Sequence, residues 1–233
     1  MSQNTDYDTF AEDYSKENES SLMNQYYERP AMLKLAGNVR HRKILDAGCG
    51  SGPLTEALLE RGAHVSGFDS SQGMINLATK RVGDAAELLV ADLGQPLPFA
   101  DDTFDDVLAS LVFHYLPDWS NALQEIRRVL RPGGRLIMSV NHPILYPWTN
   151  PGQDYFKLTK YSDDHSFNGQ PAVLTYWHRP LHAMSDAFAK AGFGIEVISE
   201  PPYSTEAPAE LVPDRLKERD AFISFIFFVL RAP

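Results

Sequence analysis

The sequence has a single cysteine, Cys49, among its 233 residues. One cysteine cannot form an intramolecular disulfide, and it excludes a zinc site built from several thiolates. Basic residues are also few, because 21 Lys and Arg stand against 31 Asp and Glu, which gives a formal net charge of −10. A chain with this charge repels phosphate backbones, so we expect no nucleic-acid partner.

Long apolar runs are absent as well. No stretch approaches the roughly 18 apolar residues of a membrane-spanning helix, even within the apolar segment AFISFIFFVL at 221–230. The first residues, MSQNTDYDTF, contain neither the basic region nor the apolar region of a signal peptide. We therefore expect a cytoplasmic protein with no membrane span. A composition of 43% hydrophobic and 22% charged residues is that of an ordinary globular protein.

Apolar runs of strand length alternate with helical patterns through the middle of the chain, which predicts βαβ units and a mostly parallel sheet. The expected strands are 43–47, 64–68, 88–91, 104–109, 135–140, 195–199 and 221–230. The expected helices are 54–61, 74–81, 121–130 and 181–191. The block Arg131-Pro132-Gly133-Gly134 is expected to end the third helix and turn the chain into the next strand.

We expect one α/β domain over residues 1–233. Residues 1–40 form a helical cap, 41–140 the core, and 181–233 the last part of the sheet. The segment 141–180 breaks the pattern with Pro, Gly, Asn and many aromatic residues, and it is longer than an ordinary connection. Its aromatic content favours an ordered lid over a linker, and we expect it to cover the acceptor site.

A loop of three glycines, Gly48, Gly50 and Gly52, follows the first expected strand and precedes the first expected helix. Such a loop allows a ligand to approach the backbone closely, with helix-terminal N–H groups facing it. A dinucleotide site needs G-x-G-x-x-G, but Pro53 stands at the last position. The carboxylate of Asp46, just before the loop, also disfavours a diphosphate and favours an ammonium or sulfonium group.

Two further acidic residues end neighbouring strands. Asp69 ends the second strand, where a carboxylate can accept hydrogen bonds from both ribose hydroxyls, and Asp92 closes the third. The three carboxylates are expected to line one crevice at the carboxyl ends of the strands. Asp46 or Asp69 alone is equally consistent with a helix cap or a turn, but together with the glycine loop they predict a site for a cationic nucleoside.

Residues 43–140 resemble the core of a class I S-adenosylmethionine-dependent methyltransferase of the type 11 group, which includes ubiquinone- and menaquinone-biosynthesis-like enzymes. The motifs that carry the resemblance are LDAGCGSG (45–52), GFDSS (67–71), ADL (91–93), LPFADDTFDDVLAS (97–110) and LRPGGRLIMS (130–139). The resemblance implies a Rossmann-like, seven-stranded sheet of order 3-2-1-4-5-7-6, with strand seven antiparallel and helices on both faces. It also implies S-adenosylmethionine as cofactor and S-adenosylhomocysteine as product.

The resemblance assigns cofactor contacts to several residues of this chain. Asp46, Gly48 and Gly50 approach the methionine part, with Cys49 as a small packing residue in the same loop. Asp69 binds the ribose, and the adenine lies among Ser70, Met74, Asp92 and Leu93. Ser110 follows the fourth strand, where substrate-facing residues lie in similar enzymes. Tyr14 and Arg29 are expected to belong to a lid that the N-terminal region folds over the cofactor.

Methyl transfer from a sulfonium is an in-line displacement, so the protein mainly has to align the reactants and exclude water. We expect a small-molecule acceptor, because the Asn/Asp-Pro-Pro-Tyr motif of methyltransferases that modify nucleic acids or glutamine side chains is missing after the fourth strand. Pro201-Pro202-Tyr203 lies after the sixth strand instead. His114 and His142 are candidates for a general base, and for both a packing or cofactor-contact role is the alternative.

Other functions stay open at this point. A non-catalytic S-adenosylmethionine-binding module would need the same glycine and acidic residues, and a nicotinamide-dependent oxidoreductase is a third, weaker alternative. His178 and His182 have a spacing that suits a metal on a helix, but Pro180 between them disfavours a helix, so we predict no metal site. The sequence is compatible with a monomer or a homodimer.

Overall fold

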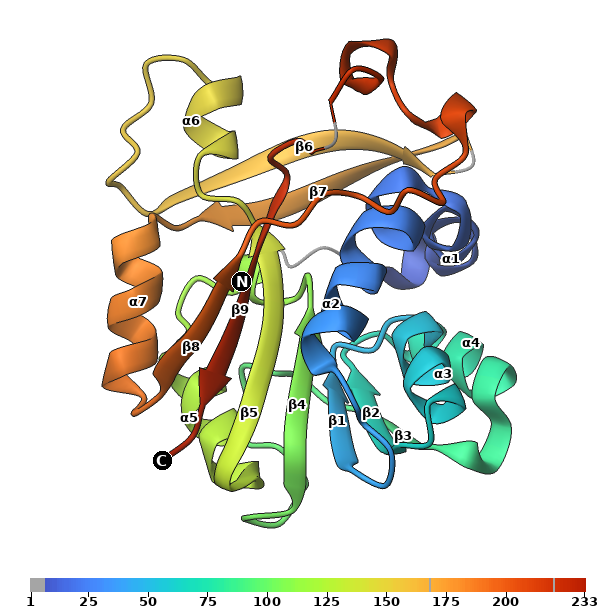
Figure 1. The fold of residues 1–233 in the computed structure, drawn as a ribbon, viewed down its shortest axis with the longest axis vertical. Helices are drawn as coiled ribbons and strands as arrows, with labels where there is room; N and C mark the ends of the chain where they lie inside the picture. The colour runs from blue at the N-terminus through green and yellow to red at the C-terminus, as the bar shows by residue number, and fades with distance from the viewer. Residues whose placement is uncertain (1–6, 168, 220) are drawn as a thin grey trace.

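The structure is a computed structural model that describes residues 7–167, 169–219 and 221–233. Its main sheet has the strand order β3-β2-β1-β4-β5-β9-β8 (Figure 1). The strands are β1 (Lys43–Ala47), β2 (His64–Asp69), β3 (Glu87–Val90), β4 (Phe104–Ser110), β5 (Leu130–Asn141), β8 (Gly194–Ser199) and β9 (Phe225–Arg231). Strand β9 runs antiparallel to both β5 and β8, and the other neighbours are parallel. The sheet order implied by the resemblance is confirmed.

Helices cover both faces of the sheet because its central strands are apolar on both sides. Along β5, Leu136 and Met138 pack in one core with α5 (Ser120–Val129) and α7 (Leu181–Lys190). Ile137 points the other way, into a second core with α2 (Arg29–Ala36) and α3 (Pro53–Glu60). α4 (Gln72–Val82) lies beside α3. The period of two along each strand thus divides the apolar residues between two layers of helices.

The block at 131–134 behaves differently from the prediction. α5 ends at Val129, and the chain enters β5 directly at Leu130, which pairs with Phe104 of β4. The next pair joins Arg135 to Asp106, so Arg131–Gly134 form an irregularity within the strand instead of a turn before it. Gly133 has φ +72° there, a value that glycine adopts readily.

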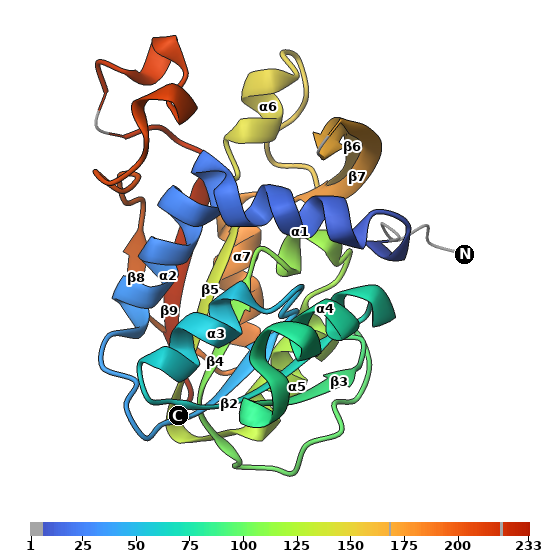
Figure 2. The same cartoon turned by 90° about the vertical axis from the view of Figure 1, so that its right-hand side faces the viewer.

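The N-terminal cap consists of η1 (Tyr7–Thr9), α1 (Ala11–Ser20), a π-helical turn η2 (Asn24–Glu28) and α2. Figure 2 shows α1 lying across the molecule above α3 and α4. Two polar contacts join it to the elements below: the Ser15 hydroxyl donates to the Ser51 hydroxyl at 2.8 Å, and Arg81 of α4 pairs with Glu19. The cap therefore closes over the glycine loop, which precedes α3.

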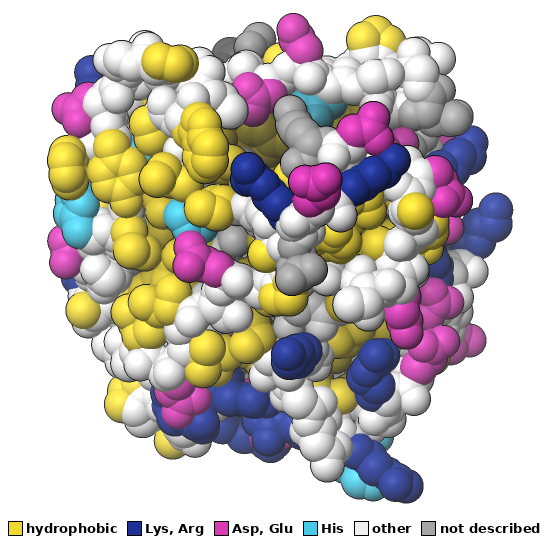
Figure 3. All heavy atoms as spheres, turned by 45° about the horizontal axis from the view of Figure 1, so that its top comes forward, with side chains coloured by type: hydrophobic (Ala, Val, Ile, Leu, Met, Phe, Trp, Pro, Cys, Tyr) yellow, Lys and Arg dark blue, Asp and Glu magenta, His cyan; other side chains and the backbone are white. Residues whose placement is uncertain are grey.

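The insertion at 141–180 contains regular structure that the sequence did not indicate. A short helix, α6 (Leu145–Thr149), is followed by a hairpin of β6 (Thr159–Phe167) and β7 (Gln170–His178). Figure 1 shows this hairpin crossing the end of the sheet at which β4 and β5 finish. In Figure 3, hydrophobic side chains are exposed over the side of this end that carries α6 and α7, and charged side chains gather on the opposite side.

The remaining elements are short: η3 (Gly83–Ala85), η4 (Phe113–Tyr115), η5 (Ala209–Leu211) and η6 (Asp214–Leu216). The expected last strand, 221–230, begins at Phe225, and its residues are buried on both faces up to Leu230. Among the helices of the described residues, none is both long and apolar enough to cross a membrane.

Candidate functional site

The glycine loop after β1 has a backbone that requires glycine. Gly48 has φ +76°, and a Cβ built on it would lie 2.7 Å from Cγ2 of Val112. Gly50 has φ +54°, and apart from its chain neighbours no residue has an atom within 4 Å of where its Cβ would be. Gly50 therefore borders open space, whereas Gly48 packs against the segment that follows β4. The backbone at Gly50 is exposed for close approach by a ligand.

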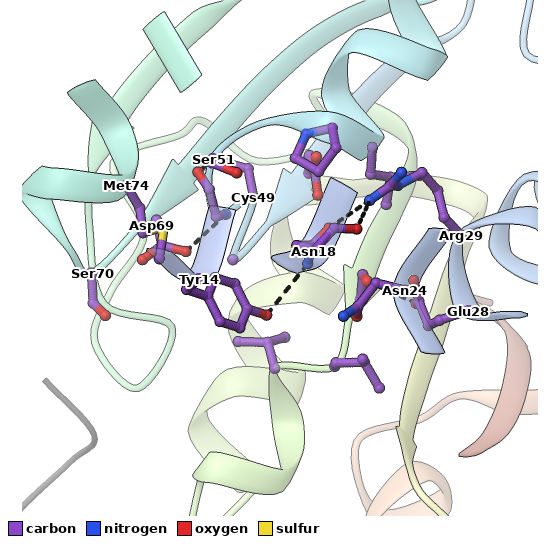
Figure 4. Close-up of a pocket in the computed structure, with 18 of the residues that line it drawn as sticks. Tyr14, Asn18, Asn24, Glu28, Arg29, Cys49, Ser51, Asp69, Ser70 and Met74 are labelled. Carbon is purple, nitrogen blue, oxygen red and sulfur yellow. Dashed lines mark hydrogen bonds between the residues drawn. The ribbon is translucent and has the colours of Figure 1, made fainter. Parts of the chain in front are cut away.

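A pocket lies over this loop, between the sheet and the cap; we call it the loop pocket. Ten residues that the sequence predicted as cofactor contacts line it: Tyr14, Arg29, Asp46, Gly48, Cys49, Gly50, Asp69, Ser70, Met74 and Ser110. Figure 4 shows Asp69, Ser70 and Met74 at one end of the pocket, Asn24, Glu28 and Arg29 at the other, and Tyr14 and Asn18 between them.

Asp69 is held by the backbone at the first of these ends. Its Oδ2 accepts the N–H of Gly50 and its Oδ1 the N–H of Ser71, both at 3.0 Å. Burial raises the pKa of this carboxyl, and the backbone hydrogen bonds oppose the rise. Both oxygens keep further lone pairs, so the carboxylate can accept hydrogen bonds from the two hydroxyls of a ribose.

Asp46, at the end of β1, is fully buried. The Thr55 hydroxyl donates to its Oδ2 at 2.6 Å, whereas its Oδ1 has no hydrogen-bond partner among the described residues. Burial raises the pKa of this carboxyl to about 7. An unpartnered buried carboxylate oxygen in a pocket wall is a position for a cationic ligand group.

Cys49 lines the same pocket as a buried side chain. Burial and the nearby carboxylates of Asp46 and Asp69 raise the pKa of its thiol well above the ordinary range. The thiol is therefore protonated at neutral pH, which fits a small packing residue and disfavours a nucleophile.

Asp92 and Leu93 are not brought into the pocket wall. The carboxylate of Asp92 is exposed and accepts the N–H of Gly94 at 2.8 Å, an ordinary turn contact. Leu93 is buried in the core beside α5. Their contact with an adenine ring stays a prediction.

The opposite end of the pocket contains a residue that the sequence analysis missed, Glu28. It is buried, and its Oε1 accepts the hydroxyls of Ser139 at 2.6 Å and Ser110 at 2.7 Å. Burial raises the pKa of the Glu28 carboxyl. The run Glu28-Arg29-Pro30, two charged residues directly before a helical apolar stretch, was the available signal, but only Arg29 was chosen from it.

A second cavity, of about 380 Å³, lies under the β6–β7 hairpin, and we call it the hairpin cavity. Its wall includes the rings of His114, Tyr115, Tyr146, Tyr161, Phe167, Tyr176 and Phe225. Tyr14, Asn24, Leu111 and Tyr115 line both this cavity and the loop pocket. The two spaces therefore meet at these four residues, next to the end of β4.

His114 lies in the wall of the hairpin cavity as a neutral ring. Burial lowers its pKa to about 3. Its Nδ1 accepts the backbone N–H of Asn141 at 3.1 Å, so the single ring proton is on Nε2. A neutral imidazole in this tautomer can donate a hydrogen bond from Nε2 to a molecule in the cavity. The arrangement therefore opposes the predicted role of His114 as a general base.

His142 is separated from both cavities. Its Nε2 lies 2.7 Å from a carboxylate oxygen of Glu200, and its Nδ1 accepts the N–H of Ile144 at 3.2 Å. Both ring nitrogens are engaged and neither cavity is lined by His142, so its role as a general base stays a prediction without support from this arrangement. Nε2 of His178 donates a hydrogen bond to the carbonyl oxygen of Tyr155 at 2.7 Å. Within the described ranges, no cluster of metal-ligating side chains occurs.

The chain is similar to known proteins over most of its length. A family model described as a methyltransferase domain matches residues 45–138. An uncharacterised protein of Haemophilus influenzae is 30% identical over 217 residues, which cover 84% of this chain and 85% of that one. A demethylmenaquinone methyltransferase of Clavibacter sepedonicus is 32% identical over 169 residues, 71% of this chain and 69% of the relative.

The chain belongs to the class I S-adenosylmethionine-dependent methyltransferases, in the type 11 group. Among solved structures, an S-adenosylmethionine-dependent methyltransferase of Mesorhizobium loti is 25% identical, with a TM-score of 0.66, over 87% of this chain and 95% of that one. The protein is thus an S-adenosylmethionine-dependent enzyme.

The loop pocket of this methyltransferase fits its cofactor. Asp69 can hold the ribose, the backbone at Gly50 allows close approach, and the unpartnered Oδ1 of Asp46 suits a cationic group. A pocket with this acidic character matches a sulfonium nucleoside better than a dinucleotide diphosphate.

Proposed function

We propose that this methyltransferase transfers the methyl group of S-adenosylmethionine to a small, planar aromatic acceptor that carries no negative charge and lies in the hairpin cavity. The observation that carries the proposal is the junction of the two spaces, where Tyr14, Asn24, Leu111 and Tyr115 line both. In-line displacement needs donor and acceptor in contact along one line, and these four shared residues are where the two spaces adjoin.

The wall of the hairpin cavity supports a planar acceptor. The ring centroids of Tyr115 and Tyr176 lie 5.3 Å apart in a stacked arrangement, and those of Tyr161 and Tyr176 lie 5.5 Å apart. His114 packs edge-on against Tyr176 at 5.1 Å. Rings fixed against one another in this way form a rigid apolar surface, on which a flat aromatic molecule buries area at little entropic cost.

The charges of the hairpin cavity support an acceptor without negative charge. Its charged lining residues are the acids Glu17 and Asp163, and no Lys or Arg is among the described residues that line it. Burial lowers the pKa of His114 to about 3 and raises that of Tyr161 to about 12, so the imidazole is uncharged and the phenol is protonated at neutral pH. An anion entering this cavity would lose hydration without gaining a cationic partner.

The chain's own residues bind and orient the reactants. When bound, S-adenosylmethionine supplies an activated methyl group on a positively charged sulfur. Tyr14 and Leu111 line both spaces, and closure of the cap and the hairpin over bound reactants would keep water from them. In this proposal the Nε2–H of His114 holds an oxygen atom of the acceptor by donating a hydrogen bond, and the ring does not act as the general base.

The relatives support the same class of acceptor. The protein of Clavibacter sepedonicus is named a demethylmenaquinone methyltransferase, as is one of Thermobifida fusca, 35% identical over 136 residues. A quinone is a planar, uncharged ring system, which is the kind of molecule that the aromatic wall and the acidic lining of the hairpin cavity favour.

The proposal is tested by incubating the protein with methyl-labelled S-adenosylmethionine and a small-molecule extract, then separating the products by ion exchange. Label in the neutral or cationic aromatic fraction supports the proposal. Label in the anionic fraction overturns the acceptor class, and cofactor binding without any labelled product favours a non-catalytic binding module. Tyr176→Ala should lower the transfer rate about tenfold or more by removing part of the wall. Trp148→Ala, an exposed aromatic outside both linings, should not change it.

A further inference from the structure

Glu28 is a buried carboxylate that is in no ion pair among the described residues, and the charge of its neighbour Arg29 acts on it only from a longer range. It ends the π-helical turn that leads into α2, and it is 3% exposed. The two groups that bind its Oε1 are neutral hydroxyls, of Ser110 on β4 and Ser139 on β5. Among the ion pairs of the described residues, none includes Glu28. Hydroxyl donors orient the carboxylate without neutralising it.

Its neighbour Arg29 is a cation whose hydrogen-bond partners are likewise neutral. The guanidinium Nη2 donates to the carbonyl of Asn18 at 3.2 Å, and the other partners of Arg29 are the side-chain oxygens of Asn18 and Gln25. These acceptors are all neutral, and Arg29 is in no ion pair of the described residues either. Two adjacent residues thus present opposite charges to the loop pocket, each held by neutral groups.

A second carboxylate faces the same pocket. Oδ1 of Asp46 has no hydrogen-bond partner among the described residues, and the charge of Glu28 is one cause of the raised pKa of Asp46. The two carboxylates are therefore within electrostatic reach of each other in a buried site. Like charges in this arrangement are stabilised by a cation between them, and an ammonium group has three N–H donors to share.

The position of Glu28 indicates whether the cation that it binds belongs to the methyl donor or to the acceptor. Glu28 lines the loop pocket and not the hairpin cavity, so it faces the methyl donor and not the acceptor. Figure 4 shows Glu28 and Arg29 at the end of the pocket opposite Asp69, Ser70 and Met74. A nucleoside with its ribose at Asp69 and its adenine beside Ser70 and Met74 would extend its amino-acid end toward Glu28.

We propose that Glu28 binds the α-ammonium group of the methionine part of the cofactor, together with Oδ1 of Asp46, while Arg29 takes the carboxylate. Ser110 and Ser139 are positioning residues, because their hydroxyls fix the Glu28 carboxylate between the ends of β4 and β5. Glu28 ends the π-helical turn and Arg29 begins α2, and both side chains line the same pocket. The proposal concerns the donor alone and is independent of the acceptor class.

The test compares two ligands in the cofactor-free protein by isothermal titration calorimetry. S-adenosylhomocysteine has the amino-acid end, whereas 5′-methylthioadenosine keeps the adenine, ribose and sulfur and lacks that end. Glu28→Gln keeps the size of the side chain and an oxygen for the two serine hydroxyls, but removes the charge. We expect it to weaken S-adenosylhomocysteine about tenfold or more and to leave 5′-methylthioadenosine unchanged.

Two controls fix the interpretation. Asp69→Asn, at the ribose end, should weaken both ligands, and Glu12→Gln, on the exposed side of α1, should weaken neither. An equal loss for both ligands in Glu28→Gln, or no loss for either, overturns the proposal. If that variant does not fold, Ser139→Ala tests the same carboxylate. It should weaken S-adenosylhomocysteine about threefold and leave 5′-methylthioadenosine unchanged, and equal effects on both overturn the proposal.

Discussion

The buried Thr55 hydroxyl donates to Oδ2 of Asp46 at 2.6 Å, and this bond fixes the carboxyl that lies just before the glycine loop. Thr55 lies in the first turns of α3 and Asp46 near the end of β1, so the bond joins the two elements on either side of the loop. It leaves Oδ1 of Asp46 for the pocket. One oxygen of this carboxyl thus links β1 to α3, and the other is left for a ligand in the loop pocket.

Burial of Asp46 has a cost in stability that depends on pH. Its pKa is about 7 in the folded protein and about 3.9 in an unfolded chain, so the folded state binds the proton more tightly between these values. The free energy of unfolding therefore falls as pH rises from about 4 to about 7. We expect Asp46→Asn to raise the melting temperature at pH 8 by roughly 4 °C, and by much less at pH 4. Calorimetric melting of both proteins at the two pH values measures this, and equal shifts at both would contradict it.

Asp69 should dominate binding of the nucleoside. Asp69→Asn keeps the size of the side chain but loses the charge that strengthens hydrogen bonds from the ribose hydroxyls, so S-adenosylhomocysteine should bind about tenfold to a hundredfold more weakly. Asp84→Asn, an exposed carboxylate in η3, is the matched control and should bind as the unmodified protein does. Titration calorimetry gives both affinities. Unchanged affinity in Asp69→Asn would remove Asp69 from the site.

His114 should stay neutral through the working pH range. Its pKa is lowered to about 3 by burial, and the Asn141 N–H occupies Nδ1. Long-range ¹H–¹⁵N spectra of the protein should show the Nε2–H tautomer for this ring, with no titration between about pH 5 and pH 8. His114→Gln is used to assign the signal. A midpoint near 6.5 for this ring would support the role of general base.

An ion cluster at the far end of the sheet should affect stability and not cofactor affinity. Asp106 is fully buried on β4 and accepts from Nη2 of Arg42 at 2.9 Å and Nε of Arg135 at 2.7 Å. Asp106→Asn leaves two partly buried guanidinium groups without their carboxylate, which should cost about 3–5 kcal/mol in urea unfolding. Asp101→Asn, whose carboxylate is 72% exposed beside Arg128, should cost at most about 1 kcal/mol. Equal costs for both would contradict the burial argument.

Much of the fold could be predicted from the sequence, because the central strands are recognisable as apolar runs. β1 was placed at 43–47 with its observed bounds, and the ends of α3 differ by one residue. The hairpin β6–β7 was missed because its exposed positions carry mixed polar residues such as Ser162 and Asp163, which give no clear alternation. The sheet order came from the resemblance, since periodicity does not determine which strands pair.

The candidate site was predicted where residues are adjacent in the chain and missed where the fold assembles them. The glycine loop with Asp46 is one local motif, and Asp69 follows a recognisable strand. Glu28 is different: its role depends on Ser110 and Ser139, which lie 82 and 111 residues away along the chain. His142 follows β5 in the sequence, but its Nε2 contacts Glu200 and it lines neither cavity, which its place in the chain does not reveal.

A crystal structure with S-adenosylhomocysteine tests the central claim most directly. We predict ribose hydroxyls within hydrogen-bond distance of Asp69, and a sulfur atom facing the junction at Tyr14 and Leu111, with its open side toward the hairpin cavity. A nucleoside bound away from Asp69, or a sulfur atom turned away from that cavity, would contradict transfer of a methyl group from the loop pocket to an acceptor beneath the hairpin.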